Sequence, residues 1–338
     1  MILVTGGTGL LGSHLLFELS QSGKPLRALK RPSSNTAIVR KVFSYYSTEA
    51  DLLFKRIEWF DADLKDFSAL EEALNGITEV YHCGAVVSFF PKDYSAMMKV
   101  NIEGTANLVN LCLGNNIERF LYVSSIATLG RADNDGLTTE ETLWKTSAGN
   151  TRYSISKYGA EREVWRGMEE GLSAVIVNPS VILGPGFWHA NSGLFPLVYK
   201  GLKYYPAGIN GFVDVRDIVK IMVKLMEQNI SRERFIINSE NVSYRQLFSW
   251  IAHYLNKPAP TTYVSPSLSG VAWRLEMLRS KITRSVPELT RDMALTSSQK
   301  YSYSNEKVRN VLGYDFIPVE KSVSEICQKF LEDIFVGT

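Results

Sequence analysis

Two residues suited to proton transfer, Tyr153 and Lys157, lie four positions apart in the segment Tyr153-Ser154-Ile155-Ser156-Lys157. An amphipathic stretch begins here, so the spacing places both side chains on one face of a predicted helix. An unperturbed tyrosine has a pKa near ~10 and exchanges protons poorly at neutral pH, but a neighbouring ammonium favours the phenolate. We therefore expect Tyr153 to act as the acid–base group and Lys157 to tune it.

A hydroxyl that polarises a substrate oxygen is expected at the end of the strand-like run Phe120–Val123, which Ser124 and Ser125 follow. The carboxyl ends of parallel strands are where open α/β sheets bind ligands. Ser125 is our choice for this role, with Tyr153 supplying the proton to a carbonyl. Ser124 stays an alternative because adjacent strand residues point in opposite directions.

Glycines at positions 6, 9 and 12 lie between a strand-like run, Met1 to Val4, and a helix-like run, Leu11 to Ser20. In this context Gly6 permits a tight turn, Gly9 lets the backbone approach a pyrophosphate, and Gly12 lets the helix pack on the strand. The free amides at the helix N-terminus favour phosphate. The pattern predicts a dinucleotide-binding loop.

The end of the second predicted strand, Leu26–Leu29, indicates which dinucleotide binds. NAD-specific folds place a carboxylate there for the ribose 2′-hydroxyl, whereas this chain has Lys30 and Arg31. A guanidinium offers a forked donor set to a 2′-phosphate. We expect NADP(H) as the preferred cofactor, with NAD(H) as the alternative, and Asp63 as an acceptor for the adenine amino group or as a helix cap.

The catalytic and binding residues sit on an alternation of short apolar runs and amphipathic segments. Further strands are predicted at 57–60, 80–82, 120–123 and 174–177, and helices at 68–74, 94–113, 153–168, 218–228, 244–255 and 323–334. The alternation predicts an α/β fold with a Rossmann-type doubly wound parallel sheet. We assign residues 1–179 and about 212–240 to the dinucleotide-binding domain. We assign residues 180–211 and 241–338 to a smaller substrate-binding lobe. Within it, loops are predicted around 184–186 and 204–211.

Composition limits the classes of partner. The chain has 338 residues, a formal charge of +2 and interspersed acids and bases, which gives no basic stripe for nucleic acid. The three cysteines, Cys83, Cys112 and Cys327, lack metal-ligand spacing, so no metal is expected. No apolar run reaches the ~18 residues of a membrane span, and no signal sequence is evident. We expect a cytoplasmic protein with a small-molecule substrate and no membrane partner, and a homodimer stays open.

At this point the chain resembles the extended short-chain dehydrogenase/reductase superfamily, in its NAD-dependent epimerase/dehydratase-like group. The matching pieces are the TGGTGLLG loop, Asp63-Leu64, Asn101 to Thr105, Ser124-Ser125, Tyr153 to Lys157 and Asn178-Pro179-Ser180. The resemblance implies a catalytic triad of Ser125, Tyr153 and Lys157, a nicotinamide wall at Pro179 to Ile182, and either a water relay or a helix-packing role for Asn101. The expected dinucleotide contacts are Gly6, Thr8, Gly9, Leu10, Leu11, Gly12, Lys30, Arg31, Asp63, Leu64, Gly84, Ala85, Val123, Ser124, Tyr153, Lys157, Pro179, Ser180, Val181 and Ile182.

Within the superfamily the chain is most similar to dihydroflavonol-4-reductase-like and 3β-hydroxysteroid-dehydrogenase-like members, judged by 28–32, 125–127 and 212–217. Dehydratases of the superfamily carry Thr-Asp-Glu where this chain has Ser125-Ile126-Ala127, so water elimination is disfavoured. Epimerases carry a diphosphate-binding arginine where this chain has Ile209-Asn210-Gly211. We therefore expect an oxidoreductase that reduces a carbonyl, or oxidises a secondary alcohol, by hydride transfer. A nucleotide-sugar epimerase and a non-catalytic regulatory dinucleotide-binding protein are the alternatives.

Aromatic pairs flank the expected cleft at Phe89-Phe90, Phe187-Trp188 and Tyr204-Tyr205. Such side chains suit an apolar or aromatic substrate, although packing within the core or between lobes accounts for each pair equally well. His189 is interpreted as a surface-loop histidine rather than a substrate contact. The sequence thus favours a small, largely apolar or aromatic substrate.

Overall fold

Seven parallel strands form the central sheet of the computed structural model, which describes residues 1–131, 136–147, 149–188, 193–228, 230–283, 285, 287 and 289–336. Their spatial order is β11 (Glu233–Ile237), β7 (Ala174–Pro179), β5 (Arg119–Val123), β4 (Glu79–His82), β1 (Ile2–Thr5), β2 (Leu26–Lys30) and β3 (Ile57–Asp61). The order reverses between β1 and β4, and this switch point is where doubly wound sheets bind ligands. The Rossmann-type α/β prediction is confirmed.

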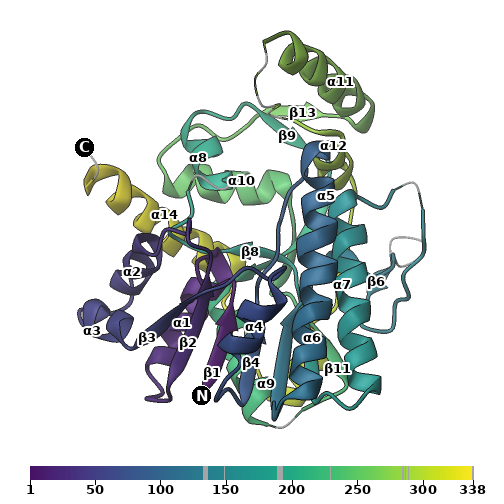
Figure 1. Cartoon of the computed structure of the whole chain (residues 1–338). Coiled ribbons are helices and arrows are strands. Elements are labelled where there is room, and N and C mark those ends of the chain that lie inside the picture. The colour runs from purple at the N-terminus through teal and green to yellow at the C-terminus, as the bar shows by residue number, and fades with distance from the viewer. Residues whose placement is uncertain are drawn as a thin grey trace.

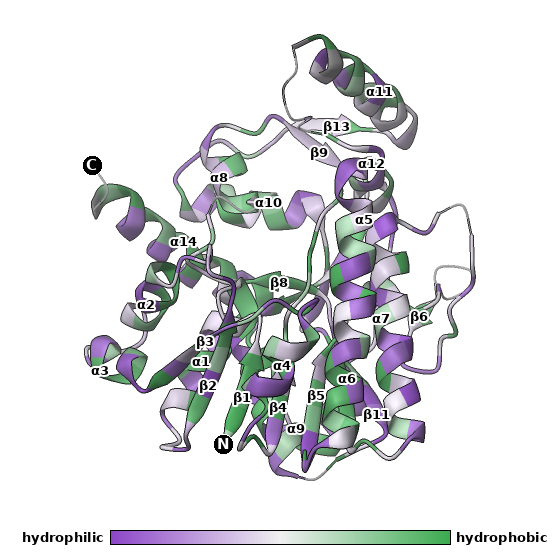
Figure 2. Cartoon of the chain, in the orientation of Figure 1, coloured by the Kyte–Doolittle hydropathy of each residue, from purple (hydrophilic) through white to green (hydrophobic). Residues whose placement is uncertain are grey.

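Helices cover both faces of this sheet (Figure 1). One face packs against α1 (Leu10–Ser20) and α9 (Val215–Glu227), and the other against α4 (Phe67–Ala73), α6 (Gly104–Gly114) and α7 (Arg152–Glu169). Because both faces are covered, the inner strands are apolar without alternation: every residue of β1 and of β7 is buried. The hydrophobic strands stand out in the interior in Figure 2.

The helix predicted over 94–113 forms in three parts. It begins as α5 (Tyr94–Met97), continues as a π-helical stretch, η2 (Met98–Glu103), and ends in α6. The 3₁₀ turn η1 (Pro91–Asp93) comes directly before α5. Inserted π turns often mark functional positions in a helix. Two helices between β2 and β3, α2 (Ala37–Ser44) and α3 (Ala50–Lys55), were not predicted.

A second body of structure lies beyond the carboxyl ends of the strands. Its small sheet consists of β8 (Val181–Leu183), β10 (Ile209–Asp214) and β12 (Glu240–Ser243), and its own apolar core includes α8 (Leu194–Tyr199), α10 (Tyr244–Tyr254) and α14 (Val319–Val336). The prediction of a loop over 204–211 was wrong, because the strands β9 (Tyr204–Pro206) and β10 form there. β9 pairs with β13 (Thr262–Val264), a partner that no local pattern could reveal.

The remaining elements complete the carboxyl side of the chain. They are η3 (Ile126–Thr128), β6 (Leu137–Thr138), α11 (Pro266–Thr283), α12 (Arg291–Ser298), β14 (Ser302–Tyr303) and α13 (Glu306–Leu312). α13 returns to the main sheet, where Val308 and Leu312 pack in the core beside α9 and β11. Among the described helices, none is both long enough and apolar enough to cross a bilayer.

Candidate active site

The glycine loop is shaped by close backbone contacts. Gly6 adopts a positive φ of 68°, and a Cβ on it would lie 2.7 Å from the Cys83 carbonyl carbon. A Cβ on Gly12 would lie 2.2 Å from the Gly6 oxygen, so only glycine lets α1 sit this close to the turn. Gly9 is the N-cap of α1. The first-turn amides of α1 are therefore presented to the loop, and this cradle fits the pyrophosphate of a dinucleotide.

A cleft of about 240 Å³ adjoins this cradle. Its walls come from the ends of the strands on both sides of the switch point and include seven of the predicted cofactor residues besides Gly6 and Gly9: Thr8, Lys30, Arg31, Asp63, Leu64, Gly84 and Ala85. The remaining predicted contacts lie in the first turn of α1 (Leu10, Leu11 and Gly12), at the end of β5 (Val123 and Ser124), on α7 (Tyr153 and Lys157) and from the end of β7 into β8 (Pro179 to Ile182). The structure thus gathers the predicted set around the carboxyl edge of the sheet.

The two cations at the end of β2 differ in their surroundings. Lys30 forms an ion pair with Asp61 at the end of the neighbouring strand β3, which offsets its charge. Arg31 is exposed and also lines the cleft. Because Lys30 is already paired, Arg31 is the better candidate for contact with a 2′-phosphate.

Asp63 and Asp66, which follow β3, have different contacts. Asp66 caps α4 by accepting a hydrogen bond from the Ala69 amide at 3.1 Å. Asp63 lines the cleft, and one of its oxygens accepts from the Lys65 amide at 3.0 Å. The second carboxylate oxygen of Asp63 lies 3.8 Å from the Lys65 ammonium, so Asp63 keeps its predicted position without being the helix cap.

Tyr153 and Ser125 meet where the first turn of α7 faces the end of β5. Burial raises the pKa of the Tyr153 phenol, and a side-chain hydrogen bond with Ser125 offsets part of this rise. The Phe89 ring lies beside Tyr153, with ring centroids 6.1 Å apart. The phenol and the hydroxyl can therefore share one substrate oxygen.

Ser124 points elsewhere. Its hydroxyl donates to the Glu161 carboxylate in the interior, and it is 5% exposed. This geometry leaves Ser125 as the serine next to Tyr153, and it leaves only the backbone of Ser124 for the predicted cofactor contact.

Lys157 lies deeper than Tyr153 on the same helix face. Its ammonium donates to the Tyr122 hydroxyl and to the Val123 carbonyl oxygen, both at 2.8 Å. Within the described residues the hydrogen bonds of Lys157 thus go to β5 rather than to Tyr153. Burial lowers the pKa of Lys157 to about 7, although Glu161 acts in the opposite direction.

A buried chain of hydrogen bonds continues from this lysine toward the glycine loop. Tyr122 is hydrogen-bonded to Thr105, whose hydroxyl lies 3.0 Å from His82 Nε2. His82 Nδ1 lies 2.6 Å from the Thr5 hydroxyl, which accepts from the Gly84 amide at 3.0 Å. Burial lowers the pKa of His82 to about 3, so this strand histidine is neutral. The chain couples the position of Lys157 to the cofactor cradle.

The lowered pKa of Lys157 predicts a pH dependence of stability in the dinucleotide-free protein. Between pH 7 and 9 the unfolded chain keeps a proton that folded Lys157 has lost, so the free energy of unfolding should rise with pH. The cysteines, whose pKa values burial raises from 9 to about 12, act in the opposite sense only above this range. Urea unfolding of the wild type and Lys157→Met should show a flatter slope for the variant; identical slopes would contradict the assignment.

Asn101 has a structural position. Lying in η2, it accepts from the Val86 amide at 2.7 Å and donates to the Val86 carbonyl and to Ser156 Oγ, each at 3.0 Å. These bonds fasten the loop after β4 to α7, which favours the packing role over the water relay.

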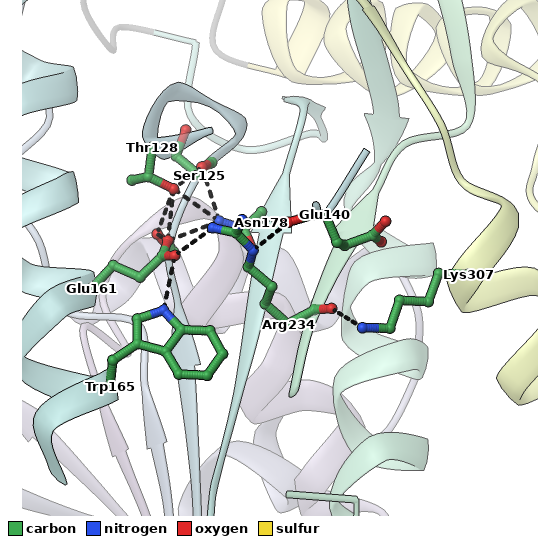
Figure 3. A network of polar contacts seen from close by, with 9 residues as sticks. Ser125, Thr128, Glu140, Glu161, Trp165, Asn178, Arg234 and Lys307 are labelled. Atoms are coloured by element: carbon green, nitrogen blue, oxygen red, sulfur yellow. Dashed lines mark hydrogen bonds and ion pairs between the residues drawn. The ribbon is translucent and has the colours of Figure 1, made fainter. Parts of the chain in front are cut away.

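Glu161, one turn beyond Lys157 on α7, was missed by the sequence analysis. Figure 3 shows its carboxylate among side chains of four elements. One oxygen accepts from Ser124, from Thr128 at 2.6 Å and from Asn178 at 2.9 Å, and the other from Arg234 and Trp165. Asn178 also donates to the Ser125 carbonyl at 3.1 Å. The signal available in the sequence was a third polar residue at four-residue spacing after Tyr153 and Lys157.

A cavity of about 400 Å³ lies next to the catalytic turn. Its lining includes the sequence neighbours of Ser125 and Tyr153, namely Ile126 and Ser154. The opposite wall comes from the lobe and includes Asn210, whose segment the sequence analysis compared with the diphosphate site of epimerases. The other residues of this wall were missed: Leu295, Thr296, Gln299, Tyr301 and Tyr303. The cavity therefore lies between the two parts of the chain, beside the residues that follow Ser125 and Tyr153.

Of the aromatic residues expected near the cleft, Phe89 has its ring beside Tyr153. Trp188 packs against Phe195 and Phe330 in the lobe core. Tyr204 is exposed, and Tyr205 packs near Tyr263. His189 lies outside the described residues.

A dinucleotide cradle at the switch point, with a phenol, a hydroxyl and a lysine beside it, defines an NAD(P)-dependent oxidoreductase of the extended short-chain dehydrogenase/reductase type. Residues 2–238 match the NAD dependent epimerase/dehydratase family, and the chain belongs to that family.

Named relatives support this class. The chain is 25% identical to dihydroflavonol 4-reductase of Arabidopsis thaliana, over 97% of this chain and 87% of that protein. It is 27% identical to sterol demethylase protein B of Methylococcus capsulatus, over 80% and 79%. Among solved structures, gox2253 superposes with a TM-score of 0.80 at 28% identity, covering 98% of both chains. The UDP-glucose 4-epimerase of Thermotoga maritima has a TM-score of 0.77 at 18% identity, which shows a shared fold.

Proposed function

We propose that this protein reduces the carbonyl group of a small, largely apolar or aromatic substrate, or oxidises the corresponding secondary alcohol, with NADP(H). The observation that carries the proposal is the pairing of Tyr153 with Ser125, one helical turn from buried Lys157. The chain neighbours of the pair, Ser154 and Ile126, line the cavity. The relatives named as reductases support the same reaction class.

Each residue has a distinct task. Ser125 donates a hydrogen bond to the substrate oxygen, and Tyr153 gives that oxygen a proton during reduction or removes one during oxidation. Lys157 is positioned by Tyr122 and Val123, and in its protonated form it places positive charge near the site, which favours the phenolate. The nicotinamide, when bound, supplies or accepts the hydride.

The proposal is tested by following nicotinamide absorbance with NADPH and a panel of apolar and aromatic ketones and aldehydes. Saturable consumption of NADPH with at least one carbonyl compound is the expected result. Turnover with none of them, in protein that binds NADPH, would argue for the non-catalytic alternative.

Arg31 is the proposed determinant of the NADP preference. Replacing Arg31 with aspartate should weaken NADP binding by about tenfold to a hundredfold while leaving NAD affinity nearly unchanged, because the carboxylate repels the 2′-phosphate and accepts from a 2′-hydroxyl. Calorimetric titration with both dinucleotides measures the change. Lys220→Asp, at an exposed position of α9, is the matched control. Equal losses for both dinucleotides at Arg31 would rule out the assignment.

The cavity supports an apolar substrate. Aliphatic and aromatic side chains line much of it, including Ile126, Leu129, Leu295, Tyr301 and Tyr303. Such walls bind by excluding water, while a few polar groups orient the reacting oxygen.

A nucleotide-sugar epimerase is the second candidate function. The observation that favours it is the presence of Arg131 and Lys145 in the cavity wall, since cationic side chains suit a diphosphate. Thermal-shift titration with UDP-sugars separates the two functions, because a ligand of the native state raises the melting temperature. Stabilisation by UDP-sugars without NADPH-dependent carbonyl reduction would favour the epimerase.

A further inference from the structure

Helix α11 turns its large aliphatic side chains toward solvent. They recur at alternating spacings of three and four residues and form one continuous stripe, consisting of Leu268, Val271, Leu275, Leu278 and Ile282. Their exposed fractions run from 52% to 74%. An ordinary surface helix places such a stripe against a core, so this one lacks a covering surface within the described chain.

The aliphatic side chains of the stripe are not the buried ones of α11. Ser269 and Ser280 are 6% and 8% exposed, Trp273 and Met277 are partly buried, and the helix packs against α12. The large aliphatic side chains therefore lie on the outer face of the helix. Exposing five aliphatic side chains to water is unfavourable, which indicates that an apolar phase covers the stripe in the working protein.

The surroundings of the stripe are aromatic. The paired strands β9 and β13 lie next to α11 at the outer end of the lobe, with Tyr204 and Tyr263 about half exposed (Figures 1 and 2). Tyrosine rings, which have an apolar body and a polar hydroxyl, are typical of the membrane–water interface.

The net positive charge around α11 indicates what covers the stripe. Residues 256–283 contain one acidic residue, Glu276, and four cationic ones, Lys257, Arg274, Arg279 and Lys281. Residues 194–206 add Lys200 and Lys203 and no acid. By helical periodicity Arg274 and Arg279 flank the stripe on either side. A second copy would bring like charges together, whereas anionic headgroups would neutralise them.

We propose that α11 is an interfacial helix that docks this protein on an anionic lipid membrane, with its stripe among the acyl chains and its arginines among the headgroups. The expectation of no membrane partner rested on the lack of a spanning run, which an interfacial helix does not need. α12, against which α11 packs, contributes Leu295 and Thr296 to the cavity wall. If the proposed reductase function holds, docking brings the substrate cavity next to the lipid phase.

Vesicle sedimentation with the full-length protein tests the docking. Binding to phosphatidylcholine vesicles that contain phosphatidylglycerol should exceed binding to pure phosphatidylcholine by about tenfold and fall in high salt. The double variant Leu275→Glu/Leu278→Glu should lose this binding. Leu52→Glu, an equally exposed leucine on α3 at the other side of the molecule, should keep it.

Melting temperature and NADPH affinity show that each variant is folded, and neither depends on membrane docking. Two results would overturn the proposal: no binding of the wild type to anionic vesicles, or equal binding by the double variant. A third such result would come from light scattering. If the wild type is a dimer and the double variant is a monomer, the stripe serves self-association instead. NADPH-dependent activity on a water-soluble carbonyl compound should be equal in wild type and double variant, so a failure of docking is distinguishable from a failure of the proposed function.

Discussion

Tyr153→Phe is expected to lower turnover by about 10²- to 10⁴-fold, the usual contribution of a positioned acid–base group. The substitution removes only the hydroxyl that pairs with Ser125, and the ring keeps its packing beside Phe89. Dinucleotide affinity should stay within about twofold of wild type, because the glycine cradle and the cleft are untouched. Steady-state kinetics and NADPH titration measure the two quantities separately.

Tyr158→Phe is the matched control on the same helix. Tyr158 stacks on Trp144, with centroids 4.4 Å apart, and has no part in the catalytic cavity. Its hydroxyl should be dispensable for turnover. Full activity in Tyr153→Phe, or equal losses in both variants, would refute the proposed mechanism.

Glu161→Ala is expected to reduce the free energy of unfolding by about 3–5 kcal/mol, the cost of leaving a buried charge without its partner. Glu161 and Arg234 have side chains 2% and 16% exposed and lie 3.2 Å apart. The variant also leaves Ser124, Thr128 and Asn178 without their shared acceptor. Denaturant unfolding measures the loss.

Glu163→Ala provides the control on the same helix. Glu163 pairs with Arg166 at a half-exposed position, and such surface pairs contribute roughly 0–1 kcal/mol. A loss at Glu161 no larger than that at Glu163 would show that the buried network is not structural. Glu161→Gln keeps the shape and one acceptor oxygen, so it should lie between the wild type and the alanine variant.

The fold was predictable because its signals are local. Each strand from β1 to β7, apart from the short β6, contains a cluster of apolar residues, and the glycine spacing of the loop follows from contacts such as that between Gly12 and Gly6. The family assignment is confirmed by the match over residues 2–238. NADP preference and the catalytic triad stay predictions.

The parts that escaped prediction depend on contacts between distant segments. Whether Ser124 or Ser125 faces the cavity depends on Glu161, and the pairing of Lys30 depends on Asp61 across two strands. β9 forms because β13, about sixty residues later, lies beside it. Local periodicity carries no information about these partners, and it also cannot place the C-terminal residues that complete the cavity.

The turn that carries Ser125 is held by contacts with Glu161 and Asn178, and this has a consequence for the order in which the protein folds during synthesis. Among the described residues, the cleft at the glycine loop is lined by residues between Thr5 and Val100, whereas Glu161 and its partner Arg234 belong to elements made much later. Domains form from the N-terminus as the chain emerges from the ribosome. A nascent chain should therefore contain all the walls of this cleft before it contains the predicted contacts at Tyr153, Lys157 and Pro179 to Ile182, and the serine turn should become fixed only after strand β11 has been synthesised and has docked.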